Sequence, residues 1–118
     1  MKRRDFIVCT LVRSGFRTSL KGFAQFCISV EMYLDDRNAT IDKIYDLIAL
    51  DFGCSKSAVE KNIRRLILSS DGGGAMGTLF GADVTDASNK EVVALFANYV
   101  ALNYEHHIKN GALLGAAF

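Results

Sequence analysis

The sequence predicts an all-α fold, a compact bundle of about six helices that contains a helix-turn-helix. Apolar residues recur at spacings of three and four along most of the chain, which is typical of helices that bury one face. No two segments show the alternating pattern of paired strands. Proline is absent, and glycines interrupt the periodic segments at Gly15, Gly53 and 72–74. These breaks separate the expected helices.

The first two helices are expected at about 4–14 and 20–34, and Ser19 is the expected N-cap of the second. The apolar stripe of this second helix consists of Phe23, Phe26, Cys27, Val30 and Leu34. A third helix, about 40–52, begins at Thr40. Its expected buried residues are Ile41, Ile44, Tyr45, Ile48 and Phe52.

A helix-turn-helix is predicted over about 41–68, where the third helix is followed closely by a fourth. Ala49 is the small residue that the first helix of such a pair needs where the second crosses it. Gly53 supplies a left-handed turn conformation that a side chain would resist. Val59 and Ile63, four residues apart, are expected to close against the preceding helix.

The fourth helix, about 55–68, carries a polar stripe roughly opposite that apolar seam. Its members, at i, i+3, i+4 and i+7, are Ser57, Glu60, Lys61 and Arg64. A helix that reads base edges in the DNA major groove needs an outward face of this kind. The pattern therefore indicates a recognition helix. The alternative is an ordinary helical hairpin whose charges face solvent.

After the fourth helix, the glycines 72–74 predict a loop, followed by a short helical turn near 78–80. The spacing of a phosphate-binding loop and its lysine are missing here. The last helix is predicted to start with a capping box from Ser88 to Glu91. The tail 108–118 shows no period, and we expect it to be disordered.

The chain, 1–118, is expected to form one domain in a reducing cytoplasm. Apolar residues make up 50% of it, so the domain can build a core without disulfides. An odd number of cysteines without metal-binding spacing predicts free, buried thiols. They are Cys9, Cys27 and Cys54. No apolar run reaches the roughly 18 residues of a membrane span, so no membrane partner is expected.

Charge is segregated along the chain, although the net charge is only +1. Residues 1–21 sum to +5 and residues 52–70 to +3, whereas residues 22–51 sum to −4 and residues 71–118 to −3. A positive face and a negative back are therefore expected. Because the basic patch carries few positive charges, we expect the affinity for non-specific DNA to be modest.

No arrangement of residues predicts an enzyme, a cofactor or a metal site. His106 and His107 are adjacent, so on a helix they point about 100° apart and cannot chelate one metal ion. Their expected role is a favourable interaction with the end of the last helix. Asp35 and Asp36 lie at a predicted helix end, without apolar surroundings, and are expected to form a solvated loop.

Five ordered motifs cover most of the chain between residue 5 and residue 105. They are GFRTSLKGF at 15–23, YDLIALDFG at 45–53, SAVEKNIRRLI at 57–67, LFG at 79–81 and SNKEVVALFANYV at 88–100. In these motifs the chain resembles the C-terminal DNA-binding effector domains of the sporulation-initiation response regulator family, stage zero sporulation protein A. The resemblance implies an all-helical domain that binds promoter boxes on double-stranded DNA and regulates transcription.

The resemblance also implies particular contacts. In that family DNA is contacted by a glutamate, by the arginine directly after it and by a second arginine three residues further on. These positions match Glu60, Lys61 and Arg64. Lysine cannot form the planar bidentate fork to guanine, so the box recognised is expected to differ. Homodimers on tandem sites and an RNA polymerase contact near Phe80 and Val84 are further implications. The family's receiver domain has no counterpart here, so control is expected through concentration, dimerisation or another partner.

The preferred interpretation is a sequence-specific transcription regulator whose helix 55–68 enters the major groove. Lys61 and Arg64 would contact bases or phosphates, and Glu60 would accept a hydrogen bond from a cytosine amino group. The alternative is a helical protein-interaction module that pairs with a full-length regulator or polymerase without tight DNA binding.

Three further residues of the same helix are assigned to DNA binding. Lys56 and Arg65 are expected to hold the DNA backbone, because their cationic side chains can pair with phosphates. Ser57 is expected to steady the start of the helix.

Overall fold

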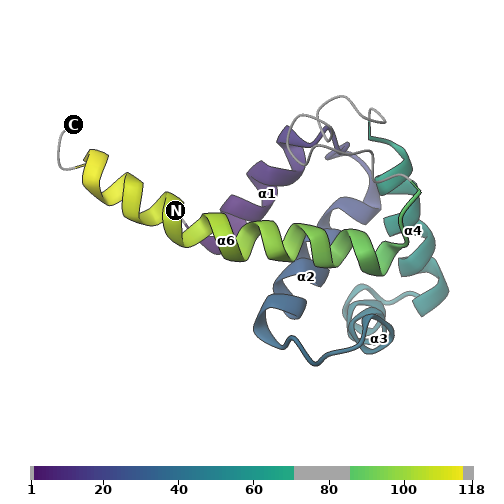
Figure 1. Cartoon of the computed structure of the whole chain (residues 1–118). Coiled ribbons are helices and arrows are strands. Elements are labelled where there is room, and N and C mark those ends of the chain that lie inside the picture. Colours follow the sequence, from purple (N-terminus) through teal and green to yellow (C-terminus); the bar gives the residue numbers. More distant parts are fainter. Residues whose placement is uncertain (1, 71–85, 116–118) are drawn as a thin grey trace.

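The computed structural model describes residues 2–70 and 86–115, with side chains described as far as His106. Within these residues the structure consists of five helices (Figure 1). They are α1 (Arg3–Arg13), α2 (Lys21–Asp35), α3 (Ile41–Phe52), α4 (Lys56–Leu68) and α6 (Asn89–Gly115). The all-α class is confirmed, with five helices described where about six were predicted. The expected helical turn near 78–80 lies outside the described residues.

Side-chain caps fix the starts of three helices. The hydroxyl groups of Thr40, Ser55 and Ser88 each accept the backbone N–H three residues later, at 3.2, 3.0 and 3.2 Å. The predicted cap of α6 by Ser88 is therefore confirmed, and the Glu91 carboxylate accepts a hydrogen bond of 3.0 Å from the Ser88 hydroxyl. The prediction of Ser19 as a cap is wrong, because α2 begins after Leu20, which makes no side-chain cap.

The core is centred on α2, which packs against each of the other four described helices (Figure 1). Three aromatic rings, from the segment after α1, from α2 and from α6, meet there. Phe26 stands edge-on to both Phe16 and Phe96, with centroid distances of 5.6 and 5.3 Å. Such edge-to-face pairs add stability beyond the apolar area that they bury.

The backbones of α2 and α4 approach each other closely at Gly22. A β-carbon placed on Gly22 would lie 2.2 Å from the carbonyl oxygen of Asn62, closer than any real contact allows. The Asn62 side chain then donates a hydrogen bond of 3.2 Å to the buried Gln25 of α2. Glycine at position 22 thus permits a backbone approach that any other residue would block.

Two predictions of burial fail. Phe52 is 43% exposed, because it is the last residue of α3 and lies beyond Ala49, the last buried residue of that helix. Cys9 and Cys54 are exposed, and Cys27 alone of the three cysteines is buried. All three are free thiols, as predicted. Cys54 lies in the turn after α3, and Cys9 lies on the outer side of α1, so neither faces the core.

Two of the six basic residues in segment 1–21 are paired with acidic residues within the protein. Arg3 and Arg4 of α1 pair with Asp35 and Glu31 of α2, each at 2.6 Å. These two arginines therefore contribute less to an open positive face than their sequence position suggested. Within the described residues, no helix is both long enough and apolar enough to span a membrane.

Replacing Gly22 with alanine should destabilise the fold. The new methyl group forces α2 and α4 apart, and such overpacking costs about 1–3 kcal/mol. Urea unfolding followed by circular dichroism measures the loss. The exposed neighbouring substitution Lys21→Ala should stay within about 0.5 kcal/mol of the wild type. Equal unfolding midpoints for Gly22→Ala and Lys21→Ala would contradict the proposed close contact.

Thiol labelling should separate the cysteines. Burial raises the pKa of Cys27 to about 12, so at pH near 8 it is both shielded and protonated. We expect a thiol reagent to modify Cys9 and Cys54 rapidly in the native protein and Cys27 only after unfolding. Peptide mass spectrometry identifies the sites. Cys27→Ala should leave rapid labelling unchanged, and rapid native labelling of Cys27 would show that its burial is wrong.

Candidate nucleic-acid interface

The turn between α3 and α4 sets the angle at which α4 is presented. Gly53 has φ of 65° and ψ of 36°, the left-handed conformation predicted for it. The next residue, Cys54, donates its backbone N–H to the carbonyl oxygen of Ala49 at 3.0 Å. Space around Gly53 is open, so its backbone conformation alone explains the glycine.

α4 has a fully buried apolar side and an exposed polar side. The buried residues are Val59, Ile63, Leu66 and Ile67, which confirms the predicted seam. On the opposite side, Ser57, Lys61 and Arg65 recur every four residues and are exposed. We call these three residues the α4 outer row. Leu68, 56% exposed, lies at its end.

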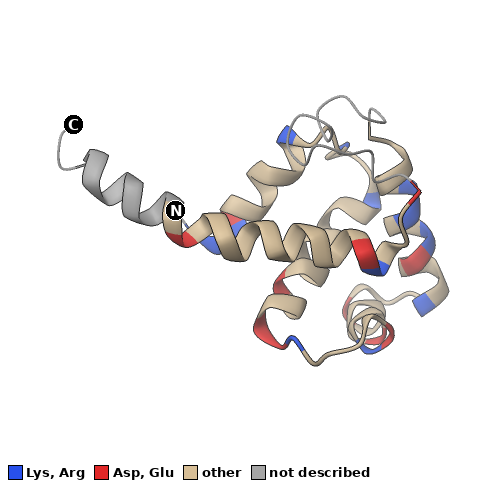
Figure 2. Cartoon of the chain, viewed as in Figure 1, with Lys and Arg blue, Asp and Glu red and all other residues tan. Residues whose placement is uncertain are grey.

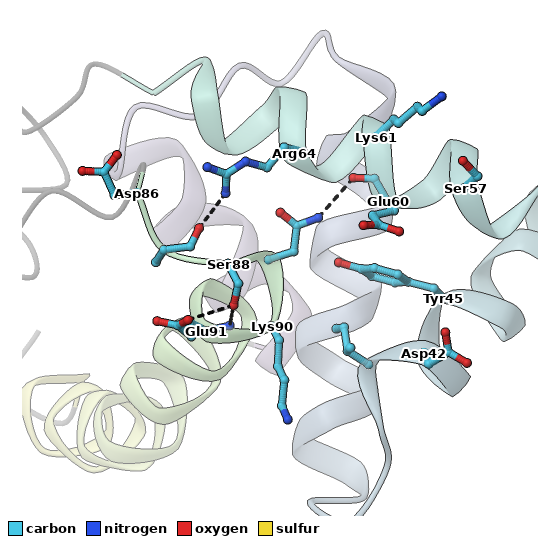
Figure 3. A pocket seen from close by; sticks show the side chains of 13 residues that line it. Asp42, Tyr45, Ser57, Glu60, Lys61, Arg64, Asp86, Ser88, Lys90 and Glu91 are labelled. Atoms are coloured by element: carbon cyan, nitrogen blue, oxygen red, sulfur yellow. Dashed lines mark hydrogen bonds between the residues drawn. The ribbon is translucent and has the colours of Figure 1, made fainter.

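Arg64 is directed away from the outer row. It is half-buried, and its Nη1 donates a hydrogen bond of 2.6 Å to the carbonyl oxygen of Ala87, just before α6 (Figure 3). The polar stripe predicted from sequence is thus divided between two sides of α4. Lys61 points outward, whereas Arg64 links α4 to the start of α6 (Figure 3).

Glu60 lies on the same flank as Arg64. Its carboxylate is exposed beside Tyr45, and its carbonyl oxygen accepts a hydrogen bond of 3.1 Å from the Asn89 side chain (Figure 3). Glu60 and Arg64 therefore border a groove of about 850 Å³ between α3, α4 and residues 86–91, which we call the α4–α6 groove. Both residues lie where a ligand in this groove would meet them.

The α4–α6 groove carries mixed charge. Its cationic residues are Lys61, Arg64 and Lys90. Its acidic residues are Asp42, Glu60, Asp86 and Glu91. This balance gives no cradle for a phosphate group, which needs an excess of positive charge. Any contact with nucleic acid in the groove would have to be polar and specific.

Lys56 is engaged by acidic residues of α3. Its ammonium lies 2.8 Å from Asp42 and 3.8 Å from Asp46, and the hydrogen bond to Asp42 raises its pKa. The cap of α4 comes from Ser55, and the role expected of Ser57 at the helix start stays a prediction. Ser57 lies in the first turn of α4 and is exposed, at the first position of the outer row.

Sequence patterns did not identify Lys21 as a candidate residue. It is exposed at the start of α2 and lines a shallow pocket together with Arg65 and Asn62. The close α2–α4 contact brings these two cations from distant parts of the chain to one place. The spacing of apolar residues predicts which face of a helix is buried, but it does not predict which residues of two distant helices come together, so Lys21 and Arg65 could not be paired from the sequence.

Tyr45 and Asn89 place two polar atoms in a buried position. Apart from the interaction between these two side chains, the Tyr45 hydroxyl and the Asn89 Oδ1 have no hydrogen-bond partner within the described residues. Burial raises the pKa of Tyr45 to about 12, the Asn89 side chain lowers it in part, and Glu60 raises it further. Both residues line the α4–α6 groove, and no sequence motif had indicated them as a pair.

Removal of the Tyr45 hydroxyl should alter the pH dependence of stability. The folded protein holds this proton with a pKa of about 12, against 10.0 ordinarily. The contribution is complete below pH 10 and is lost as the pH rises towards 12. Between these values wild-type stability should fall more steeply than that of Tyr45→Phe in urea unfolding. At pH 7 the variant should lose at most about 1.5 kcal/mol, the upper end for one hydrogen bond, because the hydroxyl interacts only with the Asn89 side chain within the described residues. Parallel curves above pH 10 would refute the assignment.

Neither metal ligands nor known relatives identify the site. In the described part of the chain, no group of three or more His, Cys, Asp or Glu side chains could hold a metal ion. No protein-family model matches the sequence, and no curated protein matches it. A function must therefore be inferred from α4 and the residues around it.

Proposed function

We propose that this protein is a sequence-specific DNA-binding transcription regulator resembling the sporulation-initiation effector domains. In this proposal α3 and α4 form a helix-turn-helix, and α4 enters the major groove. The observation that carries it is the α4 outer row, three exposed polar residues opposite a fully buried apolar side. The left-handed turn at Gly53 supports the same arrangement.

Lys61 is the central base-contacting residue of this proposal. It is exposed in the middle of the outer row, and its ammonium can donate to the acceptors of a guanine edge. Glu60 would accept from a cytosine amino group. Arg64 already donates to Ala87, so it would reach DNA only by exchanging that contact, and we assign it a second, supporting role.

Backbone phosphates would be held on the side of α4 that faces α2. Arg65 and Lys21 line the same shallow pocket there, and both are exposed. Lys56 is bound by Asp42 and would contribute less than the sequence predicted. With so few cations available, affinity should depend on salt only moderately.

The proposal includes a cytoplasmic regulator that acts on promoter boxes, as a homodimer where sites occur in tandem. A polymerase contact near Phe80 and Val84 belongs to it as well, although these residues lie outside the described part of the chain. A second candidate function is a protein-interaction module. The mixed charge of the α4–α6 groove favours it, because such a surface suits a polar protein segment better than a phosphate backbone.

Selection from a pool of random DNA duplexes at low salt should enrich one short sequence. Against that sequence, measured by fluorescence anisotropy, Lys61→Ala should cost about 1–3 kcal/mol and relax the preference at one position. Arg65→Ala should weaken binding to all sequences and lower the slope of log affinity against log salt by about one.

Lys43→Ala is the matched control, because Lys43 is an exposed lysine on α3 that lies outside the α4–α6 groove. It should bind DNA as the wild type does. If no sequence is enriched, or if Lys61→Ala and Lys43→Ala bind alike, the regulator proposal fails and the interaction module becomes the better account.

A further inference from the structure

A second groove lies between α2 and α3, with a volume of about 580 Å³. One wall is formed by Ile28 and Met32 of α2, and the other by Leu47 and Leu50 of α3. Asp51 closes one side, and Ile48 completes the lining. We call this the α2–α3 groove. All its lining residues come from these two helices, so it is separate from the α4 outer row.

The groove exposes large apolar side chains to solvent. Leu50 is 81% exposed and Leu47 is 47% exposed, while Ile28 and Met32 are only partly buried. Single exposed apolar residues are ordinary on protein surfaces. Four of them line one hollow, which offers a place where the apolar side chains of a partner can be buried.

The spacing of these residues suits a helical partner. Ile28 and Met32 are four residues apart on one wall, and Leu47 and Leu50 are three apart on the other. An amphipathic helix laid in such a trough places its own side chains between the two rows. The flexible side chain of Met32 can adjust to the shape of the occupant.

The charge around the groove defines the partner further. The segment 22–51 contains six acidic and two basic residues, and Figure 2 shows the acidic ones at the end of α2 and around α3. Four of these acidic side chains are already paired with basic ones, namely Glu31, Asp35, Asp42 and Asp46. Asp51, in contrast, lines the groove itself and is exposed. This one carboxylate gives the groove a negative charge that a cationic side chain of a partner can meet.

We propose that the α2–α3 groove binds a basic amphipathic helix of a partner protein. Leucine-like side chains of the partner fill the trough between Met32 and Leu50, and its lysine or arginine side chains pair with Asp51. This binding does not depend on α4 contacting DNA. The domain thus carries two independent surfaces, one on α4 and one on α2 and α3.

A designed helical peptide tests this surface, with leucines along one face and lysines elsewhere. Titrated into the isotope-labelled protein, it should shift backbone amide NMR signals of α2 and α3 around the groove. Leu50→Ser should weaken its binding about tenfold, since the buried contact is lost. Asp51→Lys should also weaken it, and increasingly so at low salt, because attraction becomes repulsion.

Two controls decide the outcome. Leu102, 77% exposed on α6, is matched to Leu50 in exposure, and Leu102→Ser should bind the peptide as the wild type does. A twin peptide with glutamate in place of lysine should bind at least about tenfold more weakly. Equal binding of the twins, equal effects of the two serine variants, or shifts mapped elsewhere would overturn the proposal.

Analytical ultracentrifugation of the protein alone tests the competing occupant. The wild type and Leu50→Ser should show the same state of association. If the wild type is a dimer and Leu50→Ser is a monomer, the groove is covered by a second copy of the chain, and the proposal of a basic partner helix is wrong. DNA binding by the α4 variants is scored separately, so failure of one proposal leaves the other intact.

Discussion

The contact between α2 and α4 at Gly22 is the constraint on which the remaining structure depends. Because no side chain intervenes there, the backbone of α4 lies directly against the start of α2, and the buried side of α4 is fixed by that approach. Gln25 and Asn62 reinforce the contact with a hydrogen bond. Because α2 also packs against α1, α3 and α6, the contact at Gly22 positions α4 relative to every other described helix.

The same contact decides which residues of α4 remain available. One flank of the helix is occupied by α2, through Asn62, and the other by the start of α6, through Arg64 and the carbonyl of Glu60. The residues of α4 that still face outward are those of the α4 outer row. If α4 binds DNA, recognition in the observed arrangement depends mainly on Lys61, with Arg65 beside the phosphates and Arg64 kept partly for internal support.

Local patterns in the sequence correctly predicted the helical class, the glycine turn at Gly53, the seam of Val59 and Ile63, and two of the caps. Each of these depends on residues close together in the chain. The failures share a different origin. The exposure of Phe52 depends on where the core ends, and the role of Gly22 depends on Asn62, forty residues away. Spacing along one helix carries no information on such distant partners.

The hydrogen bonds on the two flanks of α4 also determine how freely it can turn. Rotation about its own axis would have to break the Asn62 contact with α2 together with the Glu60 and Arg64 contacts near α6. Neighbouring residues of a helix point about 100° apart, so a rotation that brought a different residue to either flank would move these donors and acceptors out of reach of their partners. α4 therefore holds its outer row at one orientation of the helix before any partner arrives, so binding has to order only the rotamers of exposed side chains such as Lys61.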